Sequence, residues 1–201
     1  SIQFDGWYID DIGILPLEST TVFSTNFDNN DFSFSTSGTN SSWEYGSPTS
    51  GPYSANSAPN VWATNLSGDY NASESSWLTS PTLDLSPYNG QTPIISFYQW
   101  NDIEHIDFDW GAIEVTKDNG ITWQEVSGKI GDINSWTPKV ILLDTSYAVS
   151  NFRLRFSFHS DYSENFSGWY IDDLRVSVTE SSVFGANCIP TPGGVAAGFV
   201  Y

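Results

Sequence analysis

Apolar and polar residues alternate through most of this chain, and this period of two restricts it to β-structure. In residues 152–158 every second position is apolar, with Phe152, Leu154, Phe156 and Phe158 on one face of an extended strand. Residues 94–100, 111–116 and 169–178 are also predicted as strands, as is the apolar run 140–143, and no segment has the 3.6-residue period of an amphipathic helix. An Asn-Gly pair in residues 117–123 predicts a hairpin. We therefore predict an all-β, two-sheet antiparallel sandwich.

A seven-residue motif occurs near both ends of the chain. Residues 6–12 (GWYIDDI) return almost unchanged as residues 168–174 (GWYIDDL), an offset of 168 minus 6, or 162 residues. That offset is the length of a domain, so we interpret the chain as one domain preceded by the last strand of another. The expected parts are a terminal strand of a preceding repeat (1–17), the domain (20–180), a linker (181–192) and the start of a following β module (193–201). Within the domain, residues 35–60 are rich in Ser, Thr, Gly, Asn and Pro and predict a long surface loop with at most one short strand.

The charge of the chain limits its partners. It has 24 Asp and Glu against 6 Lys and Arg, a formal net charge of -18, which argues against nucleic acid and anionic membrane surfaces as partners. No apolar run approaches the roughly 20 residues that a membrane-spanning helix needs, so we expect no membrane insertion. Carboxylates suit divalent cations, although a solvated acidic surface accounts for most of these charges. Cys188 is the only cysteine, which excludes an intrachain disulfide and a zinc-thiolate cluster.

Motifs for catalysis are missing from the sequence. The two histidines, His105 and His159, lack the His-Glu-x-x-His spacing of a zinc hydrolase. Residues 159–161 (His-Ser-Asp) cannot form a triad, because neighbours on a strand point to opposite faces. The 24 acidic residues neither exclude nor support the carboxylate pair of a glycosidase. We therefore predict a non-catalytic module.

Several stretches of the chain together resemble a known family. They are residues 26–28, 77–86, 97–100 with Glu104 and Asp109, 111–115, 118–123, 154–156 with Ser160 and Asp161, and 168–174. In this order they resemble the MAM-like jelly-roll modules of secreted bacterial proteins, including those appended to immune-inhibitor-A-type metallopeptidases and the cleaved-adhesin domains of gingipains. The chain lacks the paired cysteines of animal MAM domains, so the comparison is with the bacterial branch. The resemblance implies a jelly-roll sandwich that serves as a binding or spacer unit and frequently holds structural calcium.

Carboxylates in the closing strand are candidate calcium ligands. Simple alternation puts Asp172 and Asp173 on opposite faces, so one must lie beside apolar neighbours unless a β-bulge shifts the register. A half-buried carboxylate needs a partner: a hard cation is one answer, and capping of loop amides or pairing with Arg153 or Arg155 is an equally good one.

Two sets of acidic residues follow from this reasoning. Since the first and last strands of a jelly roll commonly neighbour each other, the preferred calcium set is Asp28, Asp161, Asp172 and Asp173. A second acidic cluster comprises Glu104, Asp107 and Asp109, for which a solvated loop is the alternative. The resemblance places Glu104 and Asp109 at recurrent positions, which favours a second site.

Aromatic residues are numerous, with 9 Trp, 10 Tyr and 13 Phe. Strand patterns place Trp62, Trp77, Trp100, Trp123 and Phe156 in the core by default. Loop-like polar surroundings make Trp43, Tyr45, Tyr53, Trp110 and Trp136 the candidate ligand-binding residues. Exposed aromatics flanked by Asn, Ser and Asp stack on sugar rings in lectin-like modules, whereas the alternative is that these side chains fold over the sandwich as loop anchors.

The sequence as a whole predicts a non-catalytic, calcium-stabilised binding or adhesion module of a secreted multi-domain bacterial protein, acting outside the cell or at its surface. Carbohydrate or a cell-surface polymer is the expected ligand, and neighbouring domains of the same chain are further expected partners. Two alternatives stay open. One is an accessory domain of a secreted peptidase that aids targeting, folding or export, and the other is a passive spacer repeat in an adhesin.

Overall fold

The structure is a computed structural model that describes residues 18–180. The predicted segments 1–17, 181–192 and 193–201, with the first copy of the repeated motif and Cys188, lie outside the described residues, so their assignments stay predictions. None of the described residues belongs to a helix long and apolar enough to cross a bilayer. The described part contains strands and two short 3-10 turns: β1 (Ser19–Thr25), β2 (Ser35–Thr39), β3 (Trp43–Gly46), β4 (Val61–Thr64), β5 (Ser75–Thr79), η1 (Ser86–Tyr88), β6 (Thr92–Asp102), β7 (Trp110–Thr116), β8 (Gln124–Glu125), β9 (Thr137–Leu142), η2 (Thr145–Tyr147), β10 (Arg153–His159) and β11 (Gly168–Thr179).

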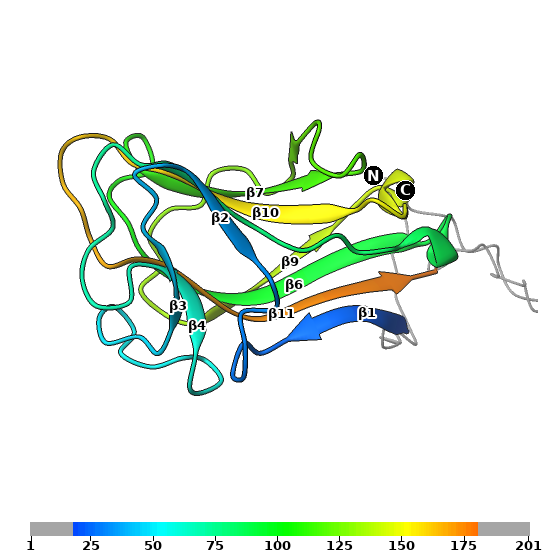
Figure 1. Ribbon diagram of the computed structural model, residues 1–201, viewed down its shortest axis with the longest axis horizontal. Helices are drawn as coiled ribbons and strands as arrows, with labels where there is room; N and C mark the ends of the chain where they lie inside the picture. Colours follow the sequence, from blue (N-terminus) through cyan, green and yellow to red (C-terminus); the bar gives the residue numbers. More distant parts are fainter. Residues whose placement is uncertain (1–17, 181–201) are drawn as a thin grey trace, which may run out of the picture.

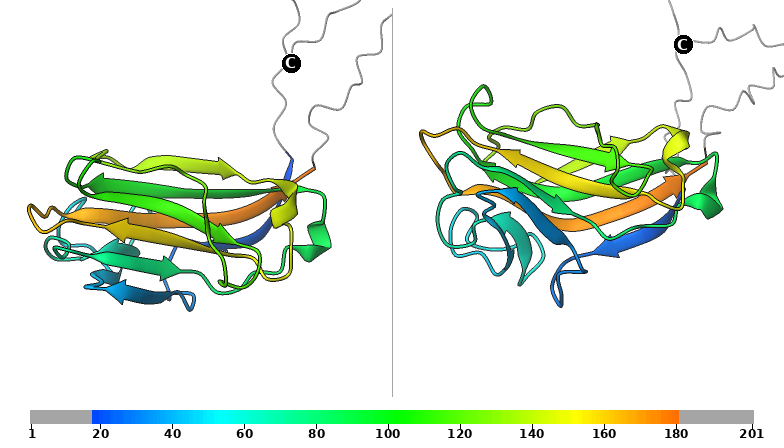
Figure 2. Two further views of the ribbon diagram at one scale, coloured as in Figure 1. Left: turned by 90° about the horizontal axis from the view of Figure 1, so that it is seen from above. Right: turned by 45° about the horizontal axis from the view of Figure 1, so that its top comes forward.

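The strands form two antiparallel sheets that pack face to face (Figures 1 and 2). One has six strands in the order β3-β4-β11-β6-β9, with β1 also paired to β11, and the other has five in the order β2-β5-β10-β7-β8. The first and last strands are therefore neighbours, with Ser19 opposite Thr179. This arrangement confirms the predicted two-sheet sandwich, and the pairing of β7 with β8 confirms the predicted Asn-Gly hairpin.

The core between the sheets follows from the alternation. On β10, Leu154, Phe156 and Phe158 are completely buried between the sheets. Trp169 of β11 is also fully buried; its ring centroid lies 5.5 Å from that of Phe156. A glycine is required opposite this ring, because a Cβ atom at Gly111 would lie 2.5 Å from the Trp169 side chain.

A β-bulge in β11 decides where the two adjacent aspartates lie. The pairing of β11 with β6 shifts register between Asp172 and Arg175, and Asp173 has a φ of 50°. Ile171 and Leu174, three residues apart, are consequently both buried in the core, which an unbroken period of two would not allow. The bulge that we gave as the exception to simple alternation is therefore present, and it spares the core from an aspartate.

The segment 35–60 differs from the predicted loop with at most one strand. It contains both β2 and β3, followed by a loop in residues 47–60. That loop packs on the outer face of the six-stranded sheet, where the Ser50 hydroxyl lies 2.9 Å from the Tyr170 hydroxyl. Every residue of β2 is exposed, so the strand has no apolar face and leaves no alternation in the sequence.

Candidate functional site

The outer face of the five-stranded sheet carries a group of aromatic and charged side chains, which we call the aromatic face. It comprises Trp77 of β5, Trp110 and Glu114 of β7, Arg155 and His159 of β10, and Trp123, which directly precedes β8. These residues alternate with the buried ones on their strands, and the pairing of β5, β10 and β7 aligns them across the sheet. Each of the six is partly exposed.

Arg155 joins two of the tryptophans. Its guanidinium carbon lies 4.9 Å from the centroid of the Trp77 ring and 4.2 Å from that of the Trp123 ring. The Arg155 Nε atom donates a hydrogen bond to a carboxylate oxygen of Glu114. Cation–π contacts and a charge-assisted hydrogen bond hold long side chains in one geometry, so these two indoles are fixed before any ligand arrives.

Trp110 forms the second part of the aromatic face. The His159 ring stacks on it with centroids 4.9 Å apart, and the Lys129 ammonium lies 3.6 Å from the Trp110 centroid. Burial lowers the pKa of His159 from its usual 6.5; the Glu114 charge opposes this shift, and the charges of Lys129 and Arg155 add to it. Aromatic rings beside hydroxyl, amide and charged groups offer both stacking surface and hydrogen bonds, the combination that sugar rings require.

The five predicted ligand-binding aromatics do not share one surface. Trp43 is 6% exposed in the core, and its ring centroid lies 6.0 Å from that of Trp169. The Tyr45 hydroxyl donates to the backbone carbonyl of Phe27, so both residues act as the anchors that we gave as the alternative.

The other three predicted aromatics lie in different places. The Trp136 indole N–H donates to the carbonyl of Ser54, which fixes it to the loop over the six-stranded sheet. Tyr53 is 76% exposed on that same loop. Only Trp110 belongs to the aromatic face.

Three of the predicted core residues are also placed differently. Trp62 and Phe156 are buried as predicted, but Trp77 and Trp123 lie on the aromatic face. Trp100 is partly exposed and packs edge-on against Tyr170 on the outer face of the six-stranded sheet. The reason is that alternation says which residues share a face and leaves open which face is buried; on β5 the buried face carries Ser76 and Leu78.

A second candidate site is a group of carboxylates, which we call the end cluster. Glu104, Asp109 and Asp161 each bring one carboxylate oxygen within 4.8 Å of the others. Asp109 is fully buried; its oxygens accept hydrogen bonds from the Tyr70 hydroxyl (2.6 Å) and from the Asp161 backbone N–H (2.7 Å). The two loops β6–β7 and β10–β11 therefore meet at this cluster.

The electrostatics of the end cluster are unfavourable without a counter-charge. Burial first, and then the charges of Asp109 and Asp161, raise the pKa of the Glu104 carboxyl. Within residues 18–180 the two ion pairs are His105–Asp107 and Arg155–Glu114, so neither supplies a cation to this group.

This grouping corrects the predicted calcium sets. Asp161 was expected beside Asp28, Asp172 and Asp173, and it lies instead with Glu104 and Asp109. Asp107 belongs to the predicted second cluster but is exposed and faces His105 at 3.4 Å. The loops that carry these residues have no hydrophobic periodicity, so the sequence pattern does not show which carboxylates lie close together in the fold.

Asp172 and Asp173 bind a loop in the described structure. The Ser57 backbone N–H donates to Asp172 (2.8 Å), and the Asn56 amide and the Ser57 hydroxyl donate to Asp173 (2.7 and 2.9 Å). Capping of loop groups, given as the alternative to a cation, is thus observed. Arg155 pairs with Glu114 instead.

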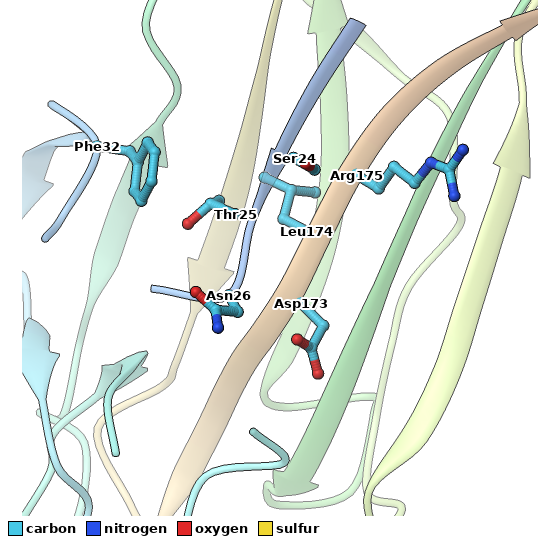
Figure 3. Close-up of a pocket in the computed structure, with 7 residues that line it drawn as sticks. All are labelled: Ser24, Thr25, Asn26, Phe32, Asp173, Leu174 and Arg175. Atoms are coloured by element: carbon cyan, nitrogen blue, oxygen red, sulfur yellow. The ribbon is translucent and has the colours of Figure 1, made fainter. Parts of the chain in front are cut away.

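A cavity of about 380 Å³ lies beside Asp173, lined by residues at the end of β1 and at the bulge of β11 (Figure 3). Asn26 and Asp173 both line it, while Arg175 points away from them. Asn26 also donates a hydrogen bond to Asp28, whose other carboxylate oxygen is buried without a hydrogen-bond partner. An orphaned carboxylate oxygen is costly to bury, so Asp28 is the member of the predicted set that most lacks a partner.

Asp172 makes the stability of the fold depend on pH. Burial raises its pKa to about 7, although hydrogen bonds from Ser57 oppose the shift. A carboxyl whose pKa is raised on folding contributes stability below its ordinary pKa of 3.8, and that contribution is lost as the pH rises through about 7. We compare the unfolding free energies of Asp172→Asn and the unmodified protein in chelator-containing buffer. As the pH rises from 4 to 8, we expect this difference to change by on the order of 3 kcal/mol in favour of the variant. Urea unfolding across that range checks this, and parallel pH profiles for the two proteins would contradict it.

We compared the chain with known protein families and with known proteins. No family model matches the sequence. Bacillopeptidase F of Bacillus subtilis (strain 168) is 36% identical over 141 residues, which cover 70% of this chain and 10% of that protein. The chain thus spans about a tenth of the length of this relative.

Two solved structures share the architecture. The CBM22-1 xylan-binding domain of Paenibacillus barcinonensis Xyn10C superimposes with a TM-score of 0.53 at 11% identity, covering 83% of this chain and 99% of that domain. The K2 cleaved adhesin domain of Lys-gingipain gives a TM-score of 0.51 at 17% identity, with 78% and 97% covered. At these identities the likeness is one of fold. The resemblance to cleaved-adhesin modules is confirmed: the chain has the sandwich fold shared by adhesin and carbohydrate-binding modules, and it is similar in sequence to one segment of a Bacillus peptidase.

Proposed function

We propose that this chain is a non-catalytic, extracellular carbohydrate-binding module and that the aromatic face holds the glycan. The observation that carries this proposal is that Trp77, Trp110 and Trp123 lie together on the outer face of one sheet, outside the hydrophobic core. Contact of a large indole ring with water is unfavourable, so three partly exposed indoles grouped on one surface indicate a ligand-binding site.

The binding mechanism follows from pre-organisation. Arg155 holds the Trp77 and Trp123 rings together and is itself held by Glu114. A ligand therefore need not order these side chains, which lowers the entropic cost of binding. The apolar faces of sugar rings would stack on the indoles, and their hydroxyls would meet the neighbouring polar groups.

The relation to Bacillopeptidase F favours an accessory role as the second candidate. A glycan-binding module can target an attached enzyme, so the two roles are compatible. Removing the module from its full-length protein should then lower retention on the polymer while the activity on a soluble substrate stays unchanged. Unchanged retention would remove the targeting role.

A glycan array tests the proposed function. The purified chain should bind at least one class of neutral or acidic plant or cell-wall polysaccharide, and the binding should survive repetition by titration calorimetry. If no glycan in such an array binds at millimolar sugar concentrations, the proposal is wrong, and a passive spacer becomes the better explanation.

We further propose that Ca²⁺ binds the end cluster. Glu104, Asp109 and Asp161 fit this ion because they are hard oxygen ligands, close together, and without a cation from the described chain. The ion would neutralise the carboxylates and tie two loops together.

Calcium should therefore change the thermal stability. We expect chelation to lower the melting temperature by several degrees and added Ca²⁺ to restore it. Asp161→Asn should abolish the response, whereas Asp107→Asn, an exposed carboxylate on the same β6–β7 loop, should keep it. If Asp173→Asn abolishes the response and Asp161→Asn does not, the ion binds beside Asp28 instead, and a melting curve that ignores calcium removes the ion altogether.

A further inference from the structure

A second cavity, of about 430 Å³, adjoins the aromatic face; we call it the side pocket. It is lined by Gln99 of β6, Lys139 of β9 and the segment 129–133, whose Ile130 bridges to Gly111 of β7. Lys129 belongs to both places, since it lines this pocket and its ammonium lies over the Trp110 ring. A ligand on the aromatic face can therefore reach the side pocket past one residue.

The side pocket holds a large share of the few basic residues. The chain has 6 Lys and Arg in all, and Lys129 and Lys139 both line this cavity. Neither forms an ion pair within residues 18–180, where the basic member of each pair is Arg155 or His105.

Acidic groups line the side pocket as well. One of them is Glu104, whose carboxylate lies beside those of Asp109 and Asp161 in the end cluster. Asp132 is exposed and accepts two hydrogen bonds from the Asn134 amide, at 2.7 and 2.8 Å. The pocket therefore holds two carboxylates, one in the end cluster and one bonded to the Asn134 amide, and two ammonium groups that form no ion pair with either carboxylate in the described chain.

A neutral donor accompanies the lysines. Gln99 is 3% exposed, and its amide oxygen accepts the Trp169 indole N–H at 3.2 Å. That bond fixes the orientation of the amide and leaves its N–H₂ group as the donor. An amide donor and two ammonium groups form a set that recognises a carboxylate.

We infer that the side pocket binds a carboxylate group carried by a glycan whose neutral rings lie on the aromatic face. The inference rests on the proposed function and names its substrate class: a polysaccharide with uronic acid residues at intervals along a neutral backbone. A densely charged polymer does not fit, because the net charge of -18 repels it. For a single carboxylate, salt screens the charges that lie farther away than the Debye length, about 8 Å at physiological salt, so its binding depends mainly on the charged groups nearby.

An inward-pointing lysine on an edge strand has a purely structural use too, since it discourages pairing of that edge with another chain. β9 is such an edge strand. This use gives Lys139 no part in ligand binding, and the following experiment separates the two roles.

The probes are glucuronoxylan, polygalacturonate and alginate, each beside its own carboxyl-reduced form, with titration calorimetry as the readout. We expect glucuronoxylan to bind best and to lose about tenfold in affinity on carboxyl reduction. Equal affinity for the native and reduced polymers would overturn the inference and leave the proposed function intact. Binding to neutral glycans alone would do the same, whereas binding to none would also remove the proposed function.

Variants place the effect in the pocket. Lys139→Gln should weaken binding to the acidic polymer about three- to tenfold and leave the carboxyl-reduced polymer unaffected. Lys129→Gln should weaken binding to the acidic polymer by more than binding to the carboxyl-reduced polymer, because Lys129 also contacts Trp110 of the aromatic face. Arg175→Gln, the same charge change on β11 and outside the side pocket, should alter neither. If Lys139→Gln fails to fold, Lys129→Gln decides through the comparison of the two polymers. Equal losses of affinity for the acidic and the carboxyl-reduced polymer, or losses no larger than those of Arg175→Gln, would overturn the placement.

Discussion

Replacing Trp169 by alanine is expected to cost about 4 kcal/mol of unfolding free energy. The side chain is fully buried, packs on Phe156 and Trp43, and donates its indole N–H to Gln99. Its loss opens a cavity between the sheets and leaves the Gln99 amide oxygen without its donor, and both effects lower stability. Gly111 cannot fill the space.

For a domain of this size, such a loss corresponds to a fall in melting temperature of roughly 10–15 °C. Urea unfolding and thermal melts measure it directly. Tyr53→Ala, at a side chain that is 76% exposed, is the matched control and should change stability by less than about 0.5 kcal/mol. A Trp169→Ala variant as stable as this control would mean that the two sheets do not pack around that ring.

The double variant Trp77→Ala, Trp123→Ala is expected to lose about 30-fold or more in affinity for the bound glycan. Both indoles belong to the aromatic face and both contact Arg155, so the variant removes the stacking surface and frees the guanidinium. Neither ring lies in the core, so the melting temperature should fall only slightly. Calorimetric titration with the best glycan from the array gives the affinity.

Trp136→Ala provides the control for this loss. Trp136 is also a partly exposed indole, but it is fixed to Ser54 over the opposite sheet. Glycan affinity should stay within about twofold of the unmodified protein. Equal losses in this control and in the double variant would mean that the aromatic face is not where the glycan binds.

The architecture was accessible from the sequence because it depends on local patterns. The alternation in residues 152–158 locates β10, and the Asn-Gly pair locates the hairpin between β7 and β8. These features report the side-chain period and the turn geometry, and both act over a few residues. The exposed strand β2 carries neither signal, so it was missed.

The sites were only partly accessible, because they depend on which outer surfaces and loops come together. The alternation of β5 fits a buried Trp77 as well as a buried Leu78, and the packing of the second sheet selects Leu78. Asp161 meets Glu104 through the folding of two loops that have no pattern of their own. The bulge at Asp172 was foreseen as a possible exception, since two adjacent aspartates cannot both avoid the core in a regular strand.

Oxidative footprinting of the tryptophans, with and without the best-binding glycan, tests most directly where the ligand binds. Mass spectrometry of the peptides follows each indole separately. We expect the glycan to protect Trp77, Trp110 and Trp123 from oxidation, and to leave Trp100 and Trp136 on the other sheet as reactive as before. Protection of Trp100 and Trp136 with an unchanged aromatic face would contradict the proposed site.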